Sequence, residues 1–87
     1  MALKIQPLRY FLLVAQTHSY QAAAALCARS QPAVSLAIRE LENQLGQALF
    51  EPGRHAQLTS FGREHFAPIK ALVDHHERVE QSLLNSA

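Results

Sequence analysis

The segment RSQPAVSLAIRELENQLG, residues 29–46, constrains the fold more than any other stretch of this chain. Its main apolar residues recur every three or four positions, the spacing that places side chains on one face of a helix: Val34, Ile38, Leu41 and Leu45. Ser30 is a suitable N-cap, and Gly46 is a suitable C-terminal stop. Pro32 falls in the first turn, where its missing N–H would have no partner within the helix. The segment therefore predicts an amphipathic helix over residues 30–45.

The opposite face of the same helix carries an apolar residue near its centre. At about 100° per residue, this face consists of Pro32, Ser35, Leu36, Arg39 and Asn43. Leu36 therefore points away from the core, where a helix of a soluble protein is normally polar. Three roles are open for Leu36: it is a tolerated surface residue, it contacts another protein, or it contacts a ligand that offers an apolar group.

Two further helices are predicted before this segment. Apolar residues fall on one face from about Pro7 to Thr17, and a proline is tolerated in the first turn. Ser19 is a suitable N-cap for YQAAAALCA, residues 20–28, whose small side chains permit another helix to pack closely. The chain therefore begins with two helices that are separated by a short break around His18.

The segment QALFEPGRHAQLT, residues 47–59, combines a Pro-Gly turn with short apolar–polar alternations. This pattern is typical of a small β-hairpin, here tipped by Gly53, Arg54 and His55. Three helices, a hairpin that carries a basic residue, and a short break between the second and third helices together describe a winged helix-turn-helix. We therefore expect a mainly α fold with a winged helix-turn-helix domain over residues 1–59.

Thr59 or Ser60 is expected to cap a long last helix, which runs to about Leu84 and absorbs Pro68 by a kink or a displaced start. Its apolar residues repeat at three and four positions, as in a coiled coil, and extend too far for a small domain alone to cover them. We expect residues 60–87 to form a linker and dimerisation helix in a homodimer. The expected interface residues are Phe66, Ile69, Leu72, Val73, His76, Val79 and Leu83.

Charge is distributed unevenly along the 87 residues. The net charge is only +1, but six basic and three acidic side chains precede Glu64, whereas two basic and four acidic side chains lie from Glu64 onward. The first part is therefore +3 and the last part −2. The single cysteine, Cys27, cannot form an internal disulfide and is expected to be a small hydrophobe under the turn. No signal-peptide or membrane run develops in MALKIQPLRYF, so we expect a cytoplasmic protein with no membrane partner.

The stretch SYQAAAALCARSQPAVSLAIRELENQLGQALF, residues 19–50, resembles the signature of LysR-type transcriptional regulators. The matching positions are Ser19, Tyr20, Ala23, Ala24, Ser30, Gln31, Pro32, Ala33, Val34, Ser35, Ile38, Leu41, Glu42, Leu45, Gly46, Leu49 and Phe50. The resemblance implies the N-terminal DNA-binding domain of a bacterial transcription factor, in which the helix after the wing pairs antiparallel across a homodimer. It also implies that a small-molecule effector binds only through a C-terminal domain, which we do not expect within these residues.

Four positions depart from the usual pattern of that family. Cys27 stands where leucine is most common, and Arg29 stands where an apolar residue is frequent. Leu36 replaces a basic or polar residue, and Pro52 occupies the usual position of the wing arginine. The resemblance therefore transfers the role of the wing arginine to Arg54.

The third helix is expected to enter the major groove of double-stranded DNA by its N-terminal end. Glu40 and Glu42 lie further along this helix and would be repelled by phosphate if the whole helix were embedded. Leu36 could then contact the C5-methyl group of a thymine. The wing near residues 52–57 is expected at the backbone or in the minor groove. The expected DNA contacts are Arg29, Ser30, Gln31, Pro32, Ser35, Leu36, Arg39 and Arg54.

Other roles remain open for several of these residues. Gln31 and Ser35 are common polar residues at a helix start, Arg39 could be solvated, and Arg54 could be only a turn residue. A helical protein-interaction adaptor without DNA binding would use the apolar face of the last helix together with the exposed Leu36.

The histidines of the last helix raise the question of a metal site. His75 and His76 are adjacent and so point about 100° apart, and no cysteine lies near them in the sequence. We therefore expect no metal and no cofactor, and a metal-responsive sensor is the weaker alternative. The sequence contains no glycine-rich phosphate loop and no catalytic constellation, so we do not expect an enzyme.

Overall fold

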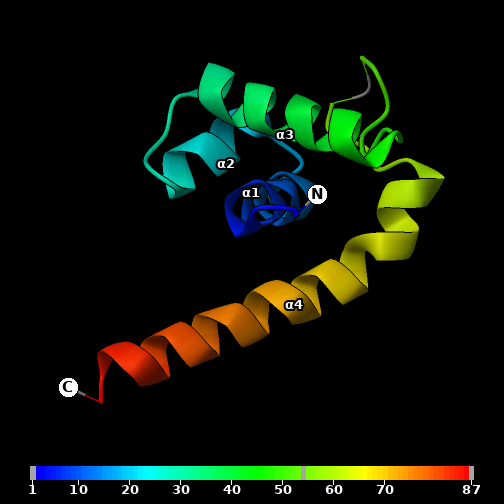
Figure 1. The fold of residues 1–87 in the computed structure, drawn as a ribbon. Helices are drawn as coiled ribbons and strands as arrows, with labels where there is room; N and C mark the ends of the chain where they lie inside the picture. Colours follow the sequence, from blue (N-terminus) through cyan, green and yellow to red (C-terminus); the bar gives the residue numbers. More distant parts are fainter. Residues whose placement is uncertain (1, 54, 87) are drawn as a thin grey trace.

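Three helices pack across one another, and a fourth, longer helix extends away from them (Figure 1). The computed structural model describes residues 2–53 and 55–86. The helices are α1 (Ile5–Thr17), α2 (Tyr20–Leu26), α3 (Gln31–Leu45) and α4 (Ser60–Leu84). The molecule measures 46 × 25 × 22 Å because the C-terminal part of α4 protrudes.

The sequence predicted several helix ends correctly. The hydroxyl oxygens of Ser19, Ser30 and Thr59 each accept a hydrogen bond from the backbone N–H three residues further along the chain. Each bond satisfies one of the N–H groups that a helix start leaves without an intrahelical partner. Gly46 ends α3 in the left-handed conformation, as expected for a glycine stop.

The first two helices differ slightly from their predicted bounds. α1 begins at Ile5, two residues earlier than expected, and Pro7 lies within its first turn as predicted. α2 ends two residues earlier than expected because Ala28 adopts a positive φ of 53°. The N–H of Arg29 then donates to the carbonyl of Ala24 at 3.0 Å, which closes the end of the helix.

α4 begins at Ser60 and bends in its first part (Figure 1). Pro68 lies inside the helix, where it has no N–H for the carbonyl of Glu64 and its ring crowds that carbonyl. Of the two predicted alternatives, a kink or a displaced start, the displaced start is excluded because α4 begins at Ser60, before the proline. No described helix, the long α4 included, is both long and apolar enough to cross a membrane.

The core is centred on α1, which packs against α2, α3 and α4. The fully buried ring of Phe11 lies 5.5 Å from the ring of Phe50 and 6.2 Å from that of Phe66, between centroids. The apolar stripe predicted for α3 faces this core, with Val34, Ile38 and Leu41 buried and Leu45 partly buried. The polar face of α3 is consequently turned to solvent.

The wing loop, residues 51–57, contains no strand among its described residues. The predicted β-hairpin is not confirmed, since only one isolated antiparallel bridge joins Phe50 to Leu58, with two backbone hydrogen bonds beside it. Pro52 has no N–H to extend a ladder toward the tip, and Ala56 adopts a positive φ of 62°. The loop therefore closes at its base without forming two strands.

Candidate nucleic-acid interface

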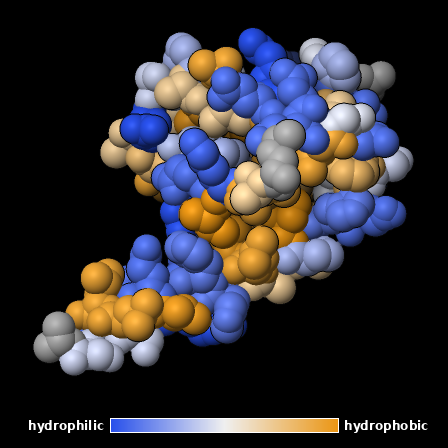
Figure 2. All heavy atoms as spheres, in the orientation of Figure 1, coloured by the Kyte–Doolittle hydropathy of each residue, from blue (hydrophilic) through white to orange (hydrophobic). Residues whose placement is uncertain are grey.

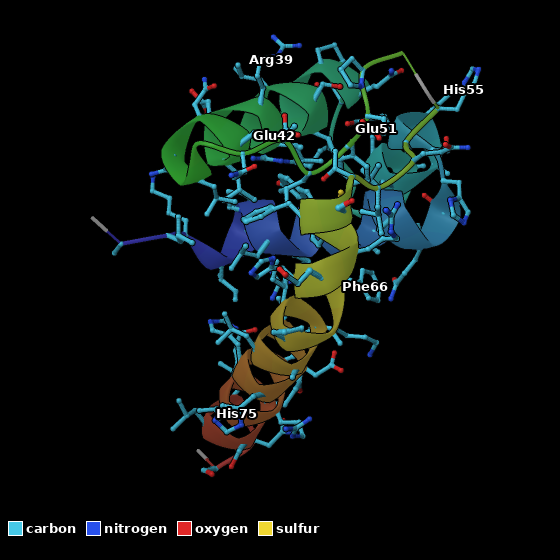
Figure 3. The ribbon with its side chains drawn as sticks, turned by 90° about the vertical axis from the view of Figure 1, so that its right-hand side faces the viewer. Arg39, Glu42, Glu51, His55, Phe66 and His75 are labelled. Atoms are coloured by element: carbon cyan, nitrogen blue, oxygen red, sulfur yellow. The ribbon has the colours of Figure 1, made fainter. Side chains whose placement is uncertain are left out.

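One exposed face of α3 gathers five of the predicted contact residues. Gln31, Pro32, Leu36 and Arg39 are exposed, and Ser35 is half-buried. Leu36 keeps 51% of its surface in solvent, so the core does not use it. Figure 3 shows Arg39 projecting away from the body of the molecule. The face exists because the apolar stripe on the other side of α3 is buried in the core.

The other three predicted contacts are placed differently. The hydroxyl of Ser30 caps α3, accepting from the N–H of Ala33 at 3.2 Å. Nε of Arg29 donates to the hydroxyl of Tyr10 at 3.0 Å, which anchors this side chain to α1 beside the turn. Ser30 and Arg29 therefore stabilise the helix-turn-helix itself. Arg54 lies outside the described residues.

Glu42 directs its carboxylate toward the base of the wing loop. Its Oε2 accepts hydrogen bonds from the backbone N–H groups of Leu49, at 2.6 Å, and Phe50, at 3.2 Å. Hydrogen bonds to an ionised acceptor are stronger than neutral ones, so this side chain ties the loop firmly to α3. The sequence indicated only that Glu42 would be repelled by phosphate, because no helical periodicity reports on a contact to a loop.

Tyr20 lies behind the same face, with its ring edge-on to Phe50 and 5.7 Å between centroids. Burial raises the pKa of Tyr20 above its ordinary value of 10.0, and the negative charge of Glu42 raises it further. The positive charge of Arg39 acts in the opposite direction. The hydroxyl of Tyr20 therefore remains protonated throughout the physiological range.

Tyr20 lines two hollows between the helices and the wing loop. The first has a volume of about 250 Å³, and its lining includes His18, Gln21, Gln31 and His55. The second has a volume of about 490 Å³, and its charged and titratable lining residues include Arg39, Glu42, Glu51 and His55. His18 and Gln21 were not among the predicted contacts, since nothing in their spacing along the sequence indicates that they lie near the wing loop.

The apolar residues of α4 fall into two groups. Phe66, Ile69 and Val73 pack against the chain's own core, and Val73 is only 2% exposed. The expectation that Val73 contributes to a dimer interface is therefore corrected, because the core already covers its side chain. Phe66 and Ile69, being partly buried, offer less surface to a second chain than the sequence suggested.

The second group lies further along α4. Leu72, Val79 and Leu83 are exposed. They line an apolar groove of about 470 Å³ together with His75, with the half-buried His76, and with Leu84, which was not among the predicted interface residues. Figure 2 shows the corresponding hydrophobic patch over the end of α4. Nδ1 of His76 is buried and has no hydrogen-bond partner among the described residues. Within the same residues, no three histidine, cysteine or acidic side chains come together as a metal site.

The fold is shared with known proteins. Residues 5–63 match a family described as bacterial regulatory helix-turn-helix proteins, lysR family. The chain belongs to the LysR family. This confirms the resemblance carried by residues 19–50, and the LysR-family relatives are transcriptional regulators rather than enzymes.

Relatives and solved structures give the extent of the similarity. This LysR-family chain is 39% identical over 84 residues to the RuBisCO operon transcriptional regulator of Allochromatium vinosum, covering 95% of the chain and 28% of the relative. It therefore spans little more than a quarter of that regulator's length. A BenM DBD–benA site 1 DNA complex has a TM-score of 0.85 at 27% identity, covering 98% of this chain and 100% of that one. The Corynebacterium glutamicum OxyR C206 mutant has a TM-score of 0.92 at 26% identity, covering 98% of this chain and 27% of that one.

Proposed function

We propose that this LysR-family chain is the DNA-binding domain of a cytoplasmic bacterial transcription factor and binds specific double-stranded DNA as a homodimer. The observation that carries the proposal is the exposed face of α3, on which Gln31, Leu36 and Arg39 project into solvent beside the helix start. The similarity to relatives whose solved structures contain DNA supports the same function.

The N-terminal end of α3 is the part that would enter the major groove. A helix fits the width of this groove, and its first turns reach the base edges. The hydrogen-bond donors and acceptors of Gln31 and Ser35 can read base edges or phosphates, and Arg39 can neutralise a phosphate. Leu36 is the apolar member of the face, and the thymine methyl is the apolar feature that the major groove offers.

The carboxylates of α3 are compatible with this orientation. Glu42 is turned toward the amides of Leu49 and Phe50, so its charge is compensated within the protein. Glu40 is exposed further along α3 and would remain outside the groove if only the first turns entered. The wing loop would then lie at the backbone or in the minor groove, with Arg54 as its proposed contact residue.

We assign the DNA-binding domain to residues 1–59 and the linker and dimerisation helix to residues 60–87. The exposed groove of α4 supports pairing with a second copy of the chain. Leu72, Val79 and Leu83 would form more contiguous apolar surface than a monomer usually exposes, and an antiparallel copy of α4 would cover it.

Selection of duplexes from a random-sequence pool tests the proposed function directly. The 87-residue chain should enrich duplexes with two related half-sites, and its affinity for them should fall steeply as salt rises, because phosphate neutralisation releases counterions. A chain that enriches no sequence and shows no salt-sensitive binding would overturn the proposal. That result is the one expected of a protein-interaction adaptor.

A further inference from the structure

A polar groove lies between the α1–α2 turn, the start of α3 and the wing loop. We call it the histidine groove and define it by His18, Gln21, Gln31 and His55, which all line the hollow of about 250 Å³. The side chains of these four residues are exposed, and none forms a hydrogen bond with another described residue. Each can donate a hydrogen bond to a ligand, His18 and His55 most strongly when protonated.

The position of the groove relates it to the DNA-facing end of α3. Gln31 is the first residue of α3 and belongs both to the groove and to the exposed helix face. Figure 3 shows His55 projecting from the wing loop at the end of the molecule that also carries Arg39, far from His75 on α4. A DNA strand that borders the major groove occupied by α3 would therefore pass the histidine groove.

We propose that the histidine groove holds a phosphodiester of the DNA backbone, with His18 and His55 as its titratable contacts, and that operator binding consequently strengthens as pH falls. This inference rests on the proposed function. A phosphodiester presents only hydrogen-bond acceptors and one negative charge, which matches four donor side chains of which two can become cations.

The charged and titratable groups around the two histidines are compatible with this assignment. The other titratable group that lines the histidine groove is Tyr20, whose raised pKa keeps it neutral. On the side of the second hollow, His55 also faces Arg39, Glu42 and Glu51. The carboxylate of Glu42 is already bonded to backbone N–H groups, and Arg39 adds positive charge that attracts a phosphate.

The direction of the pH effect follows from linkage. A phosphate next to an imidazole favours the protonated form, so the protein–DNA complex binds more protons than the separated protein and DNA. Affinity therefore rises as pH falls through the range in which histidines change charge, about pH 8 to pH 6. The duplex itself keeps its phosphate charge throughout that range, so the effect belongs to the protein.

Affinity for a duplex obtained by the selection described above would be measured at about pH 6 and about pH 8 at constant salt. The wild-type chain should bind on the order of tenfold or more tightly at the lower pH. His18→Asn and His55→Asn should each lose a large part of this gain. Asparagine suits both sites, because His18 and His55 have positive φ values of 57° and 43° and asparagine tolerates that conformation. His65→Asn, on α4 but outside the lining of the histidine groove, of the second hollow and of the α4 groove, is the matched control and should retain the whole gain.

A second measurement uses the unmodified protein. Nuclear magnetic resonance can follow each imidazole during a pH titration, and His18 and His55 should titrate at higher pH in the complex than in the free chain, whereas His65 should not change. Unaltered titration of both groove histidines, or variants that keep the wild-type pH response, would overturn the inference. Equal shifts with inorganic phosphate at the same ionic strength would overturn the assignment to the DNA backbone. Failure of the wild-type chain to bind any duplex at either pH would instead overturn the proposed function.

Discussion

Glu42 of α3 accepts a hydrogen bond from the backbone N–H of Leu49 at 2.6 Å, and this bond fixes the wing loop to the helix that we propose to read DNA. The same carboxylate oxygen also accepts from Phe50. The loop has no strands among its described residues, and its base is held by the bridge from Phe50 to Leu58 and by burial of Phe50 in the core. Glu42 adds a direct link between this base and α3.

Replacement of this residue should destabilise the fold. Glu42→Ala leaves two partly buried N–H groups without an acceptor and should lower the free energy of unfolding by about 1–3 kcal/mol. Glu42→Gln keeps an acceptor oxygen but not the charge, so its effect should be smaller. Urea denaturation measures both effects, with the exposed neighbour Glu40→Ala as the control. Equal stabilities of Glu42→Ala and Glu40→Ala would show that the bonds contribute nothing.

Gly62 in the first turn of α4 should not tolerate a side chain. An alanine ordinarily stabilises a helix interior by about 1 kcal/mol relative to glycine. At Gly62, however, a Cβ would collide with the carbonyl oxygen of Leu49 and press on the side chain of Leu58. Gly62→Ala should therefore lower the free energy of unfolding by about 1–3 kcal/mol. Ser60→Ala, an exposed change in the same turn, is the control, and a Gly62→Ala variant more stable than wild type would contradict the packing argument.

Tyr20 should make the stability of the chain depend on alkaline pH. Its raised pKa means that the folded chain retains the phenolic proton at pH values where the unfolded chain loses it. The unfolded chain then binds fewer protons, so the free energy of unfolding decreases as pH rises above about 10.0, the ordinary value for tyrosine. Tyr20→Phe removes this contribution, and its stability should fall less steeply above that pH than the wild type's. Parallel stability curves for the two proteins would be inconsistent with the raised pKa.

Leu36 should affect DNA binding without affecting the fold, provided that the proposed function holds. Its side chain is half exposed and lies outside the core, so Leu36→Ala should unfold at nearly the wild-type urea concentration. If Leu36 packs on a thymine methyl, replacing that thymine by uracil should cost the wild type about 1 kcal/mol of binding free energy per half-site.

The control for the contact between Leu36 and the thymine methyl is the same replacement of thymine by uracil, measured with the Leu36→Ala variant. Leu36→Ala should be much less sensitive to uracil at that position, since the two changes remove the same interaction and are not additive. A uracil scan that finds no position at which the two proteins differ would exclude Leu36 as a base contact. Contact with another protein would then be the better explanation for its exposure.

The groove of α4 should hold two chains together. The wild-type chain should sediment as a dimer at micromolar concentration, and the double change Leu72→Glu and Val79→Glu should produce monomers, because it places charge in the apolar groove. Helicity should persist, since both residues are exposed within one chain. Ala71→Glu, exposed but outside the groove lining, should remain dimeric. A wild-type chain that stays monomeric throughout this concentration range would refute the dimer.

The helices of this protein are determined largely by local sequence. The N-caps at Ser30 and Thr59 and the stop at Gly46 each depend on atoms within four residues along the chain, so spacing and residue type sufficed to predict them. The exposure of Leu36 followed from the same periodicity. These features made the helix-turn-helix and its family resemblance visible before any tertiary contact was known.

Contacts between distant segments decided the remaining features. The wing loop lacks strands among its described residues, and its base is held by one antiparallel bridge and by the hydrogen bonds to Glu42, a residue of α3. Val73 is not available to a dimer interface, because the core of the same chain already buries its side chain. His18 and His55 line one groove because the α1–α2 turn and the wing loop come together near Gln31 of α3. Helical periodicity describes which side chains share a face, but only packing determines what that face meets.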